Sequence, residues 1–241
     1  MKIVAIIQAR VGSKRLPGKI LKKIDGIPMI IKQLKRISYS KTLNQIIIAA
    51  PKSKKNNKLI SLIKKNKFNF YRGSETNVLK RYYFAAKKFK ADAIVRITSD
   101  NPLVPPELID KFVKKFRNSN FDYVSNVFPL TYPMGCGVEI ISFKALEKVY
   151  RKSKINYYKE HVTPYIHKNR KKFKIYNFKL KKDLSKFRLT VDEIDDLKVV
   201  KDIFSIFRPR IDFSFSKIVK LFKEEPEIFL KNIHIKQKNS N

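Results

Sequence analysis

Residues 2–19 read KIVAIIQARVGSKRLPGK, an apolar run followed directly by a loop with two glycines and four cationic side chains. The run at 2–8 is almost continuously apolar, which predicts a β-strand buried on both faces. Apolar residues then recur at helical spacing in residues 28–37. A strand that leads through a loop into a helix is the unit of α/β folds, so this stretch indicates that class.

The same unit recurs along the first half of the chain. We expect strands at 45–50, 68–71, 93–98 and 123–125, and helices at 57–65, 77–89 and 105–116. Their alternation predicts a sheet with parallel strand pairs. Ligands of such sheets bind beyond the carboxyl ends of the strands. Four loops are therefore expected on one rim, namely those after Gln8, Tyr71, Thr98 and Ser125.

The second half of the chain has a different pattern. We expect strands at 138–142 and 188–191, an edge or antiparallel strand at 173–180, and helices at 193–207 and 214–223. A chain of 241 residues fits one domain. We therefore expect a single domain over 1–236, with an excursion at about 130–180 and a frayed tail at 237–241.

Composition limits the class of protein. No apolar run approaches the roughly 20 residues that a membrane span needs, and the apolar N-terminus is too short for a signal peptide. The single cysteine, Cys136, has no internal partner for a disulfide. These features together predict a cytoplasmic protein. Cys136 lies between two glycines, but no Cys-His-Asn pattern accompanies it, so we interpret it as a bystander and not as a nucleophile.

The formal net charge of +35 has two interpretations. One is a protein that binds nucleic acid or another polyanion. The other is a lysine-rich composition without a dedicated role. The cations are 43 lysines and 12 arginines, although phosphate and base recognition favour arginine. The lysines are also scattered over the predicted helices, so we favour the compositional interpretation and expect no nucleic-acid partner.

The opening loop at 9–19 carries the clearest chemical signal. Glycines let backbone N–H groups approach a phosphate, and fixed cations offset its charge. The loop does not match the P-loop, because Gly12 lies six residues before Gly18 and Ile20 follows Lys19 where Ser or Thr is required. A dinucleotide-binding G-x-G-x-x-G motif is also absent. The residues alone predict a phosphate-binding loop of another type.

This loop closely resembles the A-R-x-G-S-x-R-L-P-G-K signature of cytidylyltransferases that make CMP-activated sugar acids. The resemblance is strongest to the spore coat polysaccharide biosynthesis protein F branch, with CMP-sialate and CMP-Kdo synthetases more distant. Further matching blocks follow in the same order, at 71–75, 78–83, 96–103, 122–126, 160–165 and 188–192. The resemblance therefore covers residues 1–207.

The resemblance implies a three-layer α/β/α, Rossmann-like nucleotidyltransferase fold with a mixed, mostly parallel sheet. It also implies transfer of CMP from CTP to a nonulosonic or Kdo-like sugar acid, with release of pyrophosphate, for surface polysaccharide synthesis. Mg²⁺ would be the divalent cofactor. Relatives commonly pair through the excursion, so a homodimer is expected.

The resemblance and the loop chemistry together give a set of candidate site residues. The predicted nucleotide-binding residues are Ala9, Arg10, Gly12, Ser13, Arg15 and Lys19 in the loop, with Arg72, Gly73 and Ser74 at the cytosine and ribose. Arg10, Lys19 and Asp100 are the predicted catalytic residues. Asp100 and Asp192 each follow a predicted strand and match the metal carboxylates of the family, although each could instead cap a turn or helix. The predicted acceptor-binding residues are Asn126, Tyr132, Glu139, Glu160 and His161, each of which could equally be structural.

Two other functions remain open at this point. One keeps the fold but uses another nucleoside triphosphate, although such enzymes often begin with a G-G-x-G-T-type loop. The other is a basic nucleic-acid-binding protein without catalysis, which the net charge alone would suggest.

Overall fold

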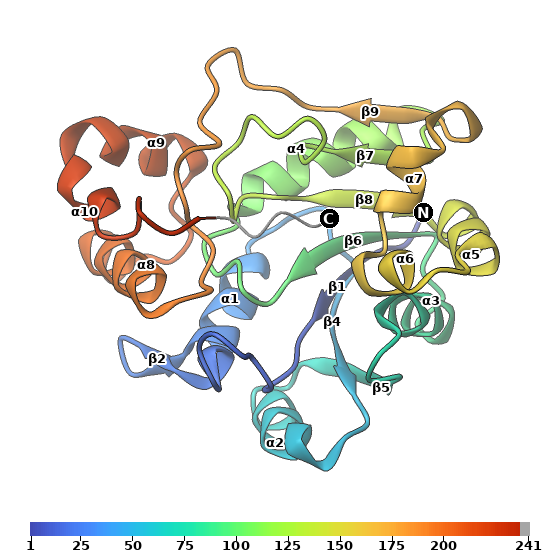
Figure 1. Ribbon diagram of the computed structural model, residues 1–241, viewed down its shortest axis with the longest axis horizontal. Coiled ribbons are helices and arrows are strands. Elements are labelled where there is room, and N and C mark those ends of the chain that lie inside the picture. The colour runs from blue at the N-terminus through green and yellow to red at the C-terminus, as the bar shows by residue number, and fades with distance from the viewer. Residues whose placement is uncertain (237–241) are drawn as a thin grey trace.

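The computed structural model describes residues 1–236, so the predicted frayed tail at 237–241 lies outside the described residues. One seven-stranded sheet, in the order β5-β4-β1-β6-β8-β7-β9, runs through the centre of the described chain (Figure 1). Its strands are β1 (Ile3–Gln8), β4 (Gln45–Pro51), β5 (Asn69–Gly73), β6 (Ala93–Thr98), β7 (Tyr123–Ser125), β8 (Glu139–Ser142) and β9 (Ile175–Asn177). Only β8 is antiparallel to its neighbours; the other pairs are parallel. The predicted mixed, mostly parallel sheet is confirmed.

Helices cover both faces of this sheet. The helices are α1 (Met29–Ile37), α2 (Asn57–Lys65), α3 (Val78–Lys88), α4 (Pro106–Arg117), α5 (Phe143–Lys152), α6 (Asn156–His161), α7 (Pro164–Lys168), α8 (Ile194–Ile206), α9 (Phe215–Glu224) and α10 (Pro226–Leu230). Short 3₁₀ turns lie at η1 (Lys19–Leu21), η2 (Lys54–Asn56) and η3 (Arg170–Lys172), and a small ribbon joins β2 (Lys23–Ile24) to β3 (Ile27–Pro28). The predicted three-layer α/β/α architecture is therefore present.

The side chains of β1 show why its sequence is apolar throughout. Ile3, Ala5 and Ile7 belong to one buried core, together with α1, α4 and α8. Val4 and Ile6 point the other way, into a second core that contains α3, α5 and α7. Because successive side chains of a strand alternate between faces, a strand covered on both faces needs an unbroken apolar run.

The strand directions place several loops on one rim, as expected. β8 is antiparallel to both β6 and β7, so β7 runs in the same direction as β6 and β1. The carboxyl ends of β1, β4, β5, β6 and β7 therefore lie on the same edge. Helices α8, α9 and α10 lie beyond this edge, at the left of Figure 1.

The segment 130–180, expected as an excursion, contributes strands to the central sheet. It supplies β8, which lies between β6 and β7, and β9, which is the edge strand. The strand expected at 173–180 is thus an edge strand, but it is only three residues long and pairs in parallel with β7. Helices α5, α6 and α7, which the sequence patterns did not predict, also come from this segment.

The prediction of a strand at 188–191 is wrong. This segment makes one isolated bridge, between Met134 and Arg188, and Leu189 N–H donates to Met134 O at 2.7 Å. Val191 N–H donates to Asp100 O at 2.7 Å. The partners of this apolar segment are therefore two loops and not a neighbouring strand, and it is held across the rim of the sheet.

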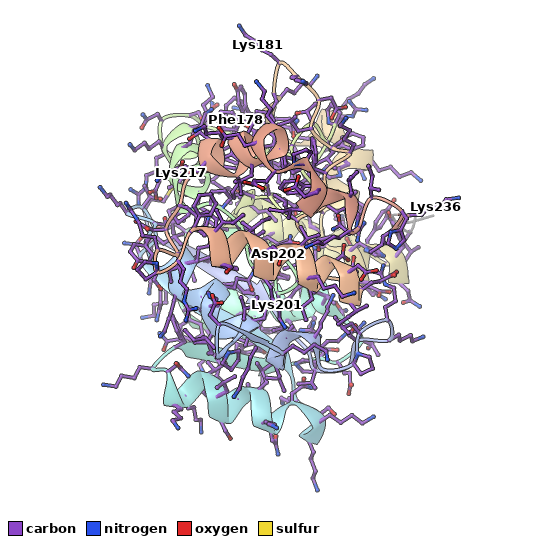
Figure 2. The ribbon with its side chains drawn as sticks, turned by 90° about the vertical axis from the view of Figure 1, so that its left-hand side faces the viewer. Phe178, Lys181, Lys201, Asp202, Lys217 and Lys236 are labelled. Atoms are coloured by element: carbon purple, nitrogen blue, oxygen red, sulfur yellow. The ribbon has the colours of Figure 1, made fainter. Side chains whose placement is uncertain are left out.

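No described helix combines the length and the apolar character that a membrane crossing requires. The lysines on the face formed by α8, α9 and α10 are spread out. Figure 2 shows Lys181, Lys201, Lys217 and Lys236 well apart from one another on this side of the molecule, and all four are exposed. Lysines spread in this way favour the compositional interpretation of the net charge over a single basic stripe for a polyanion.

Candidate active site

The opening loop leaves β1 and folds back over the rim. Ala9 N–H donates to Ala49 O at 3.1 Å, and Val11 N–H donates to Asn56 Oδ1 at 3.0 Å. Gly18 has φ 65°, a left-handed conformation that favours glycine, and it starts η1. Among the described residues, no heavy atom beyond the glycine and its chain neighbours lies within 4 Å of the position that a Cβ on Gly12 would take. The start of the loop is thus anchored to β4 and η2, with open space beside Gly12.

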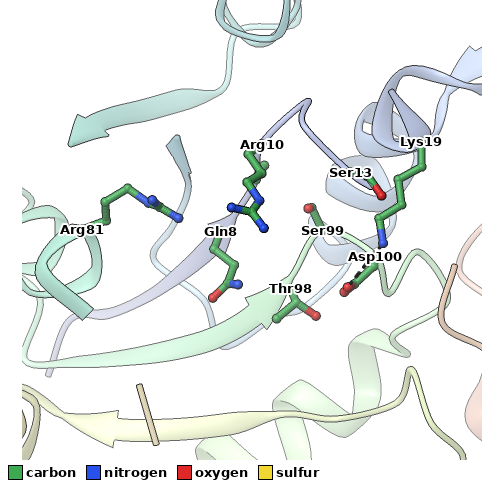
Figure 3. A pocket seen from close by; sticks show the side chains of 9 residues that line it. Gln8, Arg10, Ser13, Lys19, Arg81, Thr98, Ser99 and Asp100 are labelled. Carbon is green, nitrogen blue, oxygen red and sulfur yellow. Dashed lines mark ion pairs between the residues drawn. The ribbon is translucent and has the colours of Figure 1, made fainter. Parts of the chain in front are cut away.

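A pocket lies between this loop, α3 and the end of β6 (Figure 3). It is lined by Gln8, Ala9, Arg10, Ser13, Lys19, Arg81, Thr98, Ser99 and Asp100. Figure 3 shows Arg81, Gln8 and Arg10 toward one end, and Ser13, Lys19 and Asp100 at the other. Five residues that the sequence predicted for the site are therefore brought together here: Ala9, Arg10, Ser13, Lys19 and Asp100.

Lys19 joins three distant segments at the floor of this pocket. Its Nζ donates to Val191 O at 2.7 Å and to Asp192 Oδ1 at 3.0 Å, and it lies 3.6 Å from Asp100 Oδ2. Arg15 Nη2 lies 2.9 Å from the same oxygen of Asp192. Burial alone would raise the pKa of Asp192, but the adjacent Lys19 and Arg15 hold it below its usual value. Asp192 is thus an ionised carboxylate surrounded by cations.

Asp100 and Asp192 fit a divalent cation. Both place an oxygen within 3.6 Å of the same ammonium nitrogen, and Asp100 Oδ1 is buried without a hydrogen-bond partner among the described residues. The described residues contain no group of three or more His, Cys, Asp or Glu side chains arranged for a metal. Mg²⁺ is commonly held by one or two carboxylates, with the other ligands supplied by water and substrate phosphates. This donor set suits that arrangement.

A second cavity of about 250 Å³ adjoins the first. It is lined by Thr98, Asp100, Asn101, Val127, Leu130, Pro133, Met134, Gly135, Gly137, Thr190 and Asp192. Thr98 and Asp100 also line the first pocket, so the two cavities meet at Asp100, one of the two predicted metal carboxylates. Gly135 is required in this wall, because it has φ +100° and a Cβ would lie 2.4 Å from the backbone of Leu189.

The segment predicted to hold cytosine and ribose lies beside the first pocket and does not line it. Arg72 Nη2 donates to the carbonyl oxygens of Lys52 and Ser53, at 2.6 and 3.1 Å. A Cβ at Gly73 would lie 2.7 Å from the Tyr71 ring. Ser74 O accepts a hydrogen bond from Arg81 Nη1 at 2.6 Å. This segment therefore orients Arg81, and Arg81 is the side chain that lines the pocket.

Sequence reasoning did not select Arg81, Gln8, Thr98 or Ser99 for the site, although the matching blocks include Arg81, Thr98 and Ser99. A signal for Arg81 was available, because it lies on the apolar face of a helix that begins just beyond the rim. It is 2% exposed, and its Nε has no hydrogen-bond partner in the described part of the chain. A buried, incompletely paired guanidinium at a pocket is a candidate for ligand binding.

The residues predicted for the acceptor occupy other positions. Asn126 is fully buried; its Nδ2 donates to Cys136 O at 3.0 Å, and its Oδ1 accepts from Val138 N–H at 2.9 Å. It thus braces the loop that forms the second cavity. Tyr132 is in the core, with its ring edge-on to Phe112 at 6.2 Å between centroids. Neither side chain is among those lining the cavity.

Glu139, Glu160 and His161 also lie away from both cavities. Glu139 is 4% exposed and pairs with Arg96, while Tyr123 Oη donates to its second oxygen at 2.5 Å. Burial alone would raise the pKa of Glu139, but Arg96 and the other donors lower it. Glu160 and His161 are on α6, which packs against α3.

Cys136 is buried, and burial raises the pKa of its thiol to about 12. At neutral pH this side chain is a neutral thiol, which is a poor nucleophile. The structure agrees with its interpretation as a bystander.

The chain is similar to known proteins over nearly its whole length. A family model described as cytidylyltransferase matches residues 4–238. The protein MJ1063 of Methanocaldococcus jannaschii is 39% identical over 241 residues, which is 99% of this chain and 98% of that protein. The spore coat polysaccharide biosynthesis protein SpsF of Bacillus subtilis is 29% identical over 232 residues, 93% of this chain and 95% of that protein.

Solved structures show the same relationship. A cytidylyltransferase from Leptospira borgpetersenii superposes with a TM-score of 0.93 at 32% identity, covering 98% of this chain and all of that one. A CMP-2-keto-3-deoxy-manno-octonic acid synthetase in complex with CTP gives a TM-score of 0.68 at 17% identity, over 86% of this chain, which shows a shared fold. Since the family model spans nearly the whole sequence, this chain belongs to the cytidylyltransferase family and is a nucleotidyltransferase.

Proposed function

We propose that this enzyme transfers CMP from CTP to a nonulosonic or Kdo-like sugar acid, with release of pyrophosphate, and acts in surface polysaccharide synthesis. The observation that carries the proposal is the position of Lys19, whose ammonium contacts Asp192 and lies 3.6 Å from Asp100 beside the glycine-containing loop. Similarity to SpsF and to a 3-deoxy-manno-octulosonate cytidylyltransferase of Chloroherpeton thalassium supports it. The latter is 31% identical over 123 residues, about half of each chain.

The first pocket suits the nucleotide. Its task would be to neutralise the triphosphate and align the α-phosphorus, because an attacking hydroxyl is repelled by the phosphate charge. Arg10, Ser13 and Lys19 line one side of the pocket and would bind the phosphates, with Arg15 close to Asp192. The open space beside Gly12 would admit a phosphate close to the backbone. Arg81, with Arg72–Ser74 behind it, would contact the base or ribose end.

Asp100 and Asp192 would hold a divalent cation, which we propose to be Mg²⁺. When bound, this ion would neutralise charge on the phosphates and orient the α-phosphate for attack. Lys19 shares its ammonium between the two carboxylates in this structure. We propose that Lys19 transfers its contact to the triphosphate when the nucleotide enters.

The second cavity is the proposed place for the acceptor sugar. It shares Thr98 and Asp100 with the first pocket, so a hydroxyl bound there would face the α-phosphorus of a nucleotide in that pocket. Thr98 and Thr190 offer hydroxyl groups, while Val127, Leu130 and Met134 make an apolar wall. Asn126 would act indirectly, by holding the 136–138 backbone.

The single domain over 1–236 and a homodimer paired through residues 130–180 are part of the proposal. Glu160 and His161 lie in that segment, where dimer formation would change their surroundings. Light scattering coupled to size exclusion would test the dimer, with a monomer mass of 28.4 kDa as the contrary result.

A panel of sugar acids with CTP and Mg²⁺, monitored by pyrophosphate release, tests the reaction. The expected result is release with CTP and at least one nonulosonic or Kdo-like acid, and little with UTP or dTTP. Asp100→Asn, which removes the carboxylate charge, is the matched inactive control. Equal release from UTP would overturn the choice of CTP, and failure of CTP with Mg²⁺ to raise the melting temperature would contradict the nucleotide site itself.

A further inference from the structure

The carboxylate of Asp192 is held from two sides. Oδ1 meets Arg15 and Lys19, and Lys19 lines the first pocket. Oδ2 faces the protein interior and lies 3.5 Å from Arg188 Nη2. The position of this carboxylate therefore depends on a residue behind the active site as well as on those within it.

Arg188 is itself fixed by Asp196. Its Nε and Nη2 each donate to one oxygen of Asp196, both at 3.1 Å, which makes a bidentate arginine–carboxylate pair. Asp196 is fully buried, and its Oδ2 also accepts the backbone N–H groups of Asp192 and Glu193, at 2.9 and 3.0 Å. Asp196 thus determines both the orientation of Arg188 and the course of the backbone that carries Asp192.

A further residue, Asn232, contacts both Arg188 and Asp196 from the turn after α10. Asn232 is 1% exposed, and its Nδ2 donates to Arg188 O at 3.1 Å and to Asp196 Oδ1 at 2.9 Å. It lies 36 residues after Asp196 in the sequence. A buried amide that bonds both a charged side chain and its partner's backbone fixes their relative position, because leaving either group unpaired would be costly.

We propose that Asn232 is a positioning residue for Asp192 and acts through Asp196 and Arg188. Through Asn232, the C-terminal segment 226–236 would then support the active site. Asn232 itself touches neither substrate nor metal in this assignment. The inference rests on the proposed function of Asp192 as a metal carboxylate. A small displacement of such a carboxylate weakens metal binding and catalysis, since both depend on ligand geometry.

Neighbouring contacts of the same segment supply a control. Lys231 Nζ lies 2.7 Å from Asp202 Oδ2, a pair on the surface that ties the segment to α8 without reaching Asp192. Lys231→Ala removes this surface contact and leaves the Asn232 amide in place. Asn232→Leu keeps a side chain of similar size and removes the amide, so the two adjacent substitutions separate docking of the segment from positioning of Asp192.

The test measures Mn²⁺ binding by electron paramagnetic resonance in the presence of CTP, together with kcat and KM for CTP. For Asn232→Leu we expect Mn²⁺ affinity to fall about tenfold, within the range typical of groups that orient metal ligands, with a fall in kcat and a small change in KM. Lys231→Ala should stay within about twofold of the wild type, since exposed pairs contribute little. A folded Asn232→Leu enzyme with wild-type Mn²⁺ affinity and kcat would overturn the proposal.

Two further measurements keep the test decisive. Should Asn232→Leu fail to fold, Arg188→Lys, which keeps the charge but loses the bidentate pair, must show the same loss of Mn²⁺ affinity, and unchanged affinity would overturn the proposal. Asp192→Asn in the Mn²⁺ titration establishes that the measured site is the one described. Absence of pyrophosphate release with every acceptor would count against the proposed reaction, while the Mn²⁺ titrations would still decide the role of Asn232.

Discussion

Two clusters of carboxylates and cations lie along β6 and its continuation, only a few residues apart, and they differ in what they leave unpaired. In the buried cluster, Glu139 has both oxygens occupied, one by Arg96 and the other by Tyr123. In the rim cluster, Asp100 Oδ1 has no partner within the described residues, and Lys19 is shared between Asp100 and Asp192. A cluster that satisfies its own charges holds strands together, whereas one that leaves an oxygen free and a cation shared is ready for an ionic ligand.

This contrast predicts that the buried cluster governs stability. Glu139→Gln should leave Arg96 as a buried charge without a counter-ion and lower the free energy of unfolding by about 3–5 kcal/mol. Urea denaturation followed by circular dichroism measures the change. A loss under about 1 kcal/mol would show that the pair is replaceable and would weaken the distinction between the two clusters.

The rim cluster should govern the reaction instead. Asp100→Asn is expected to lower kcat by about 10²–10³-fold, the range found when one group that stabilises charge in the transition state is removed. Its melting temperature should change little, because Lys19 keeps its bonds to Val191 and Asp192. Steady-state pyrophosphate release measures the first effect and thermal melting the second. A large fall in melting temperature with a normal kcat would mean that the rim cluster governs stability and not the reaction, which would contradict the prediction.

A smaller effect on KM for CTP should distinguish Arg72, which the sequence selected for the nucleotide site, from Arg81, which lines the pocket in the structure. Arg81→Leu should raise KM for CTP about tenfold, which corresponds to one charge-assisted hydrogen bond, with little change in kcat. Arg72→Leu should change KM less, because the Arg72 guanidinium is directed to the carbonyl oxygens of Lys52 and Ser53. Parallel titrations of CTP at saturating acceptor compare the two. A larger effect for Arg72 would favour the prediction from the sequence.

The smallest predicted effect concerns pH. The neighbouring cations hold the pKa of Asp192 below its value in the unfolded chain, which is about 3.9. Its contribution to stability is therefore present above pH 4 and is lost as the pH falls through the lower folded pKa. The difference in unfolding free energy between wild type and Asp192→Asn should be constant from pH 5 to 7 and shrink below pH 4. A difference that grows on acidification would contradict this sign.

The net charge of the chain did not by itself decide between an enzyme and a nucleic-acid-binding protein. A non-catalytic nucleic-acid-binding protein was one interpretation of the net charge of +35. Membership of the cytidylyltransferase family makes the chain an enzyme, so that alternative is wrong. Scattered lysines on a surface give net charge without a defined site, whereas Lys19 gains its importance from three specific neighbours.

Local sequence patterns predicted the fold class, which is confirmed, and a phosphate-binding role for the opening loop, which stays a prediction. Continuous apolar runs such as 3–8 and 93–98 indicate strands covered on both faces, and the helices between them follow from their 3.6-residue spacing. The predictions failed where partners are distant: 188–191 has the composition of a strand, but its backbone N–H groups bond to Met134 and Asp100, which lie in loops. Helices α6 and α7 were missed because they are only six and five residues long and depend on packing, α6 against α3 and α7 against α6. Helix α5 is ten residues long and buries Ala145, Leu146 and Val149 on one face, so its helical spacing was a signal that the sequence analysis missed.

By itself, then, the sequence predicted an α/β fold with a glycine-containing, cationic loop after its first strand, since those features depend on neighbours within a few positions. The nucleotidyltransferase activity and the two candidate aspartates were implied by the resemblance to a known family. Only the tertiary structure brought Lys19 to Val191 and Asp192, 172 and 173 residues away, aimed Arg81 into the pocket, and placed Asn232 behind Asp192. The reason is physical. Periodicity encodes which face of an element is buried, but which side chains share one cavity depends on how the loops at the carboxyl ends of the strands cross in space.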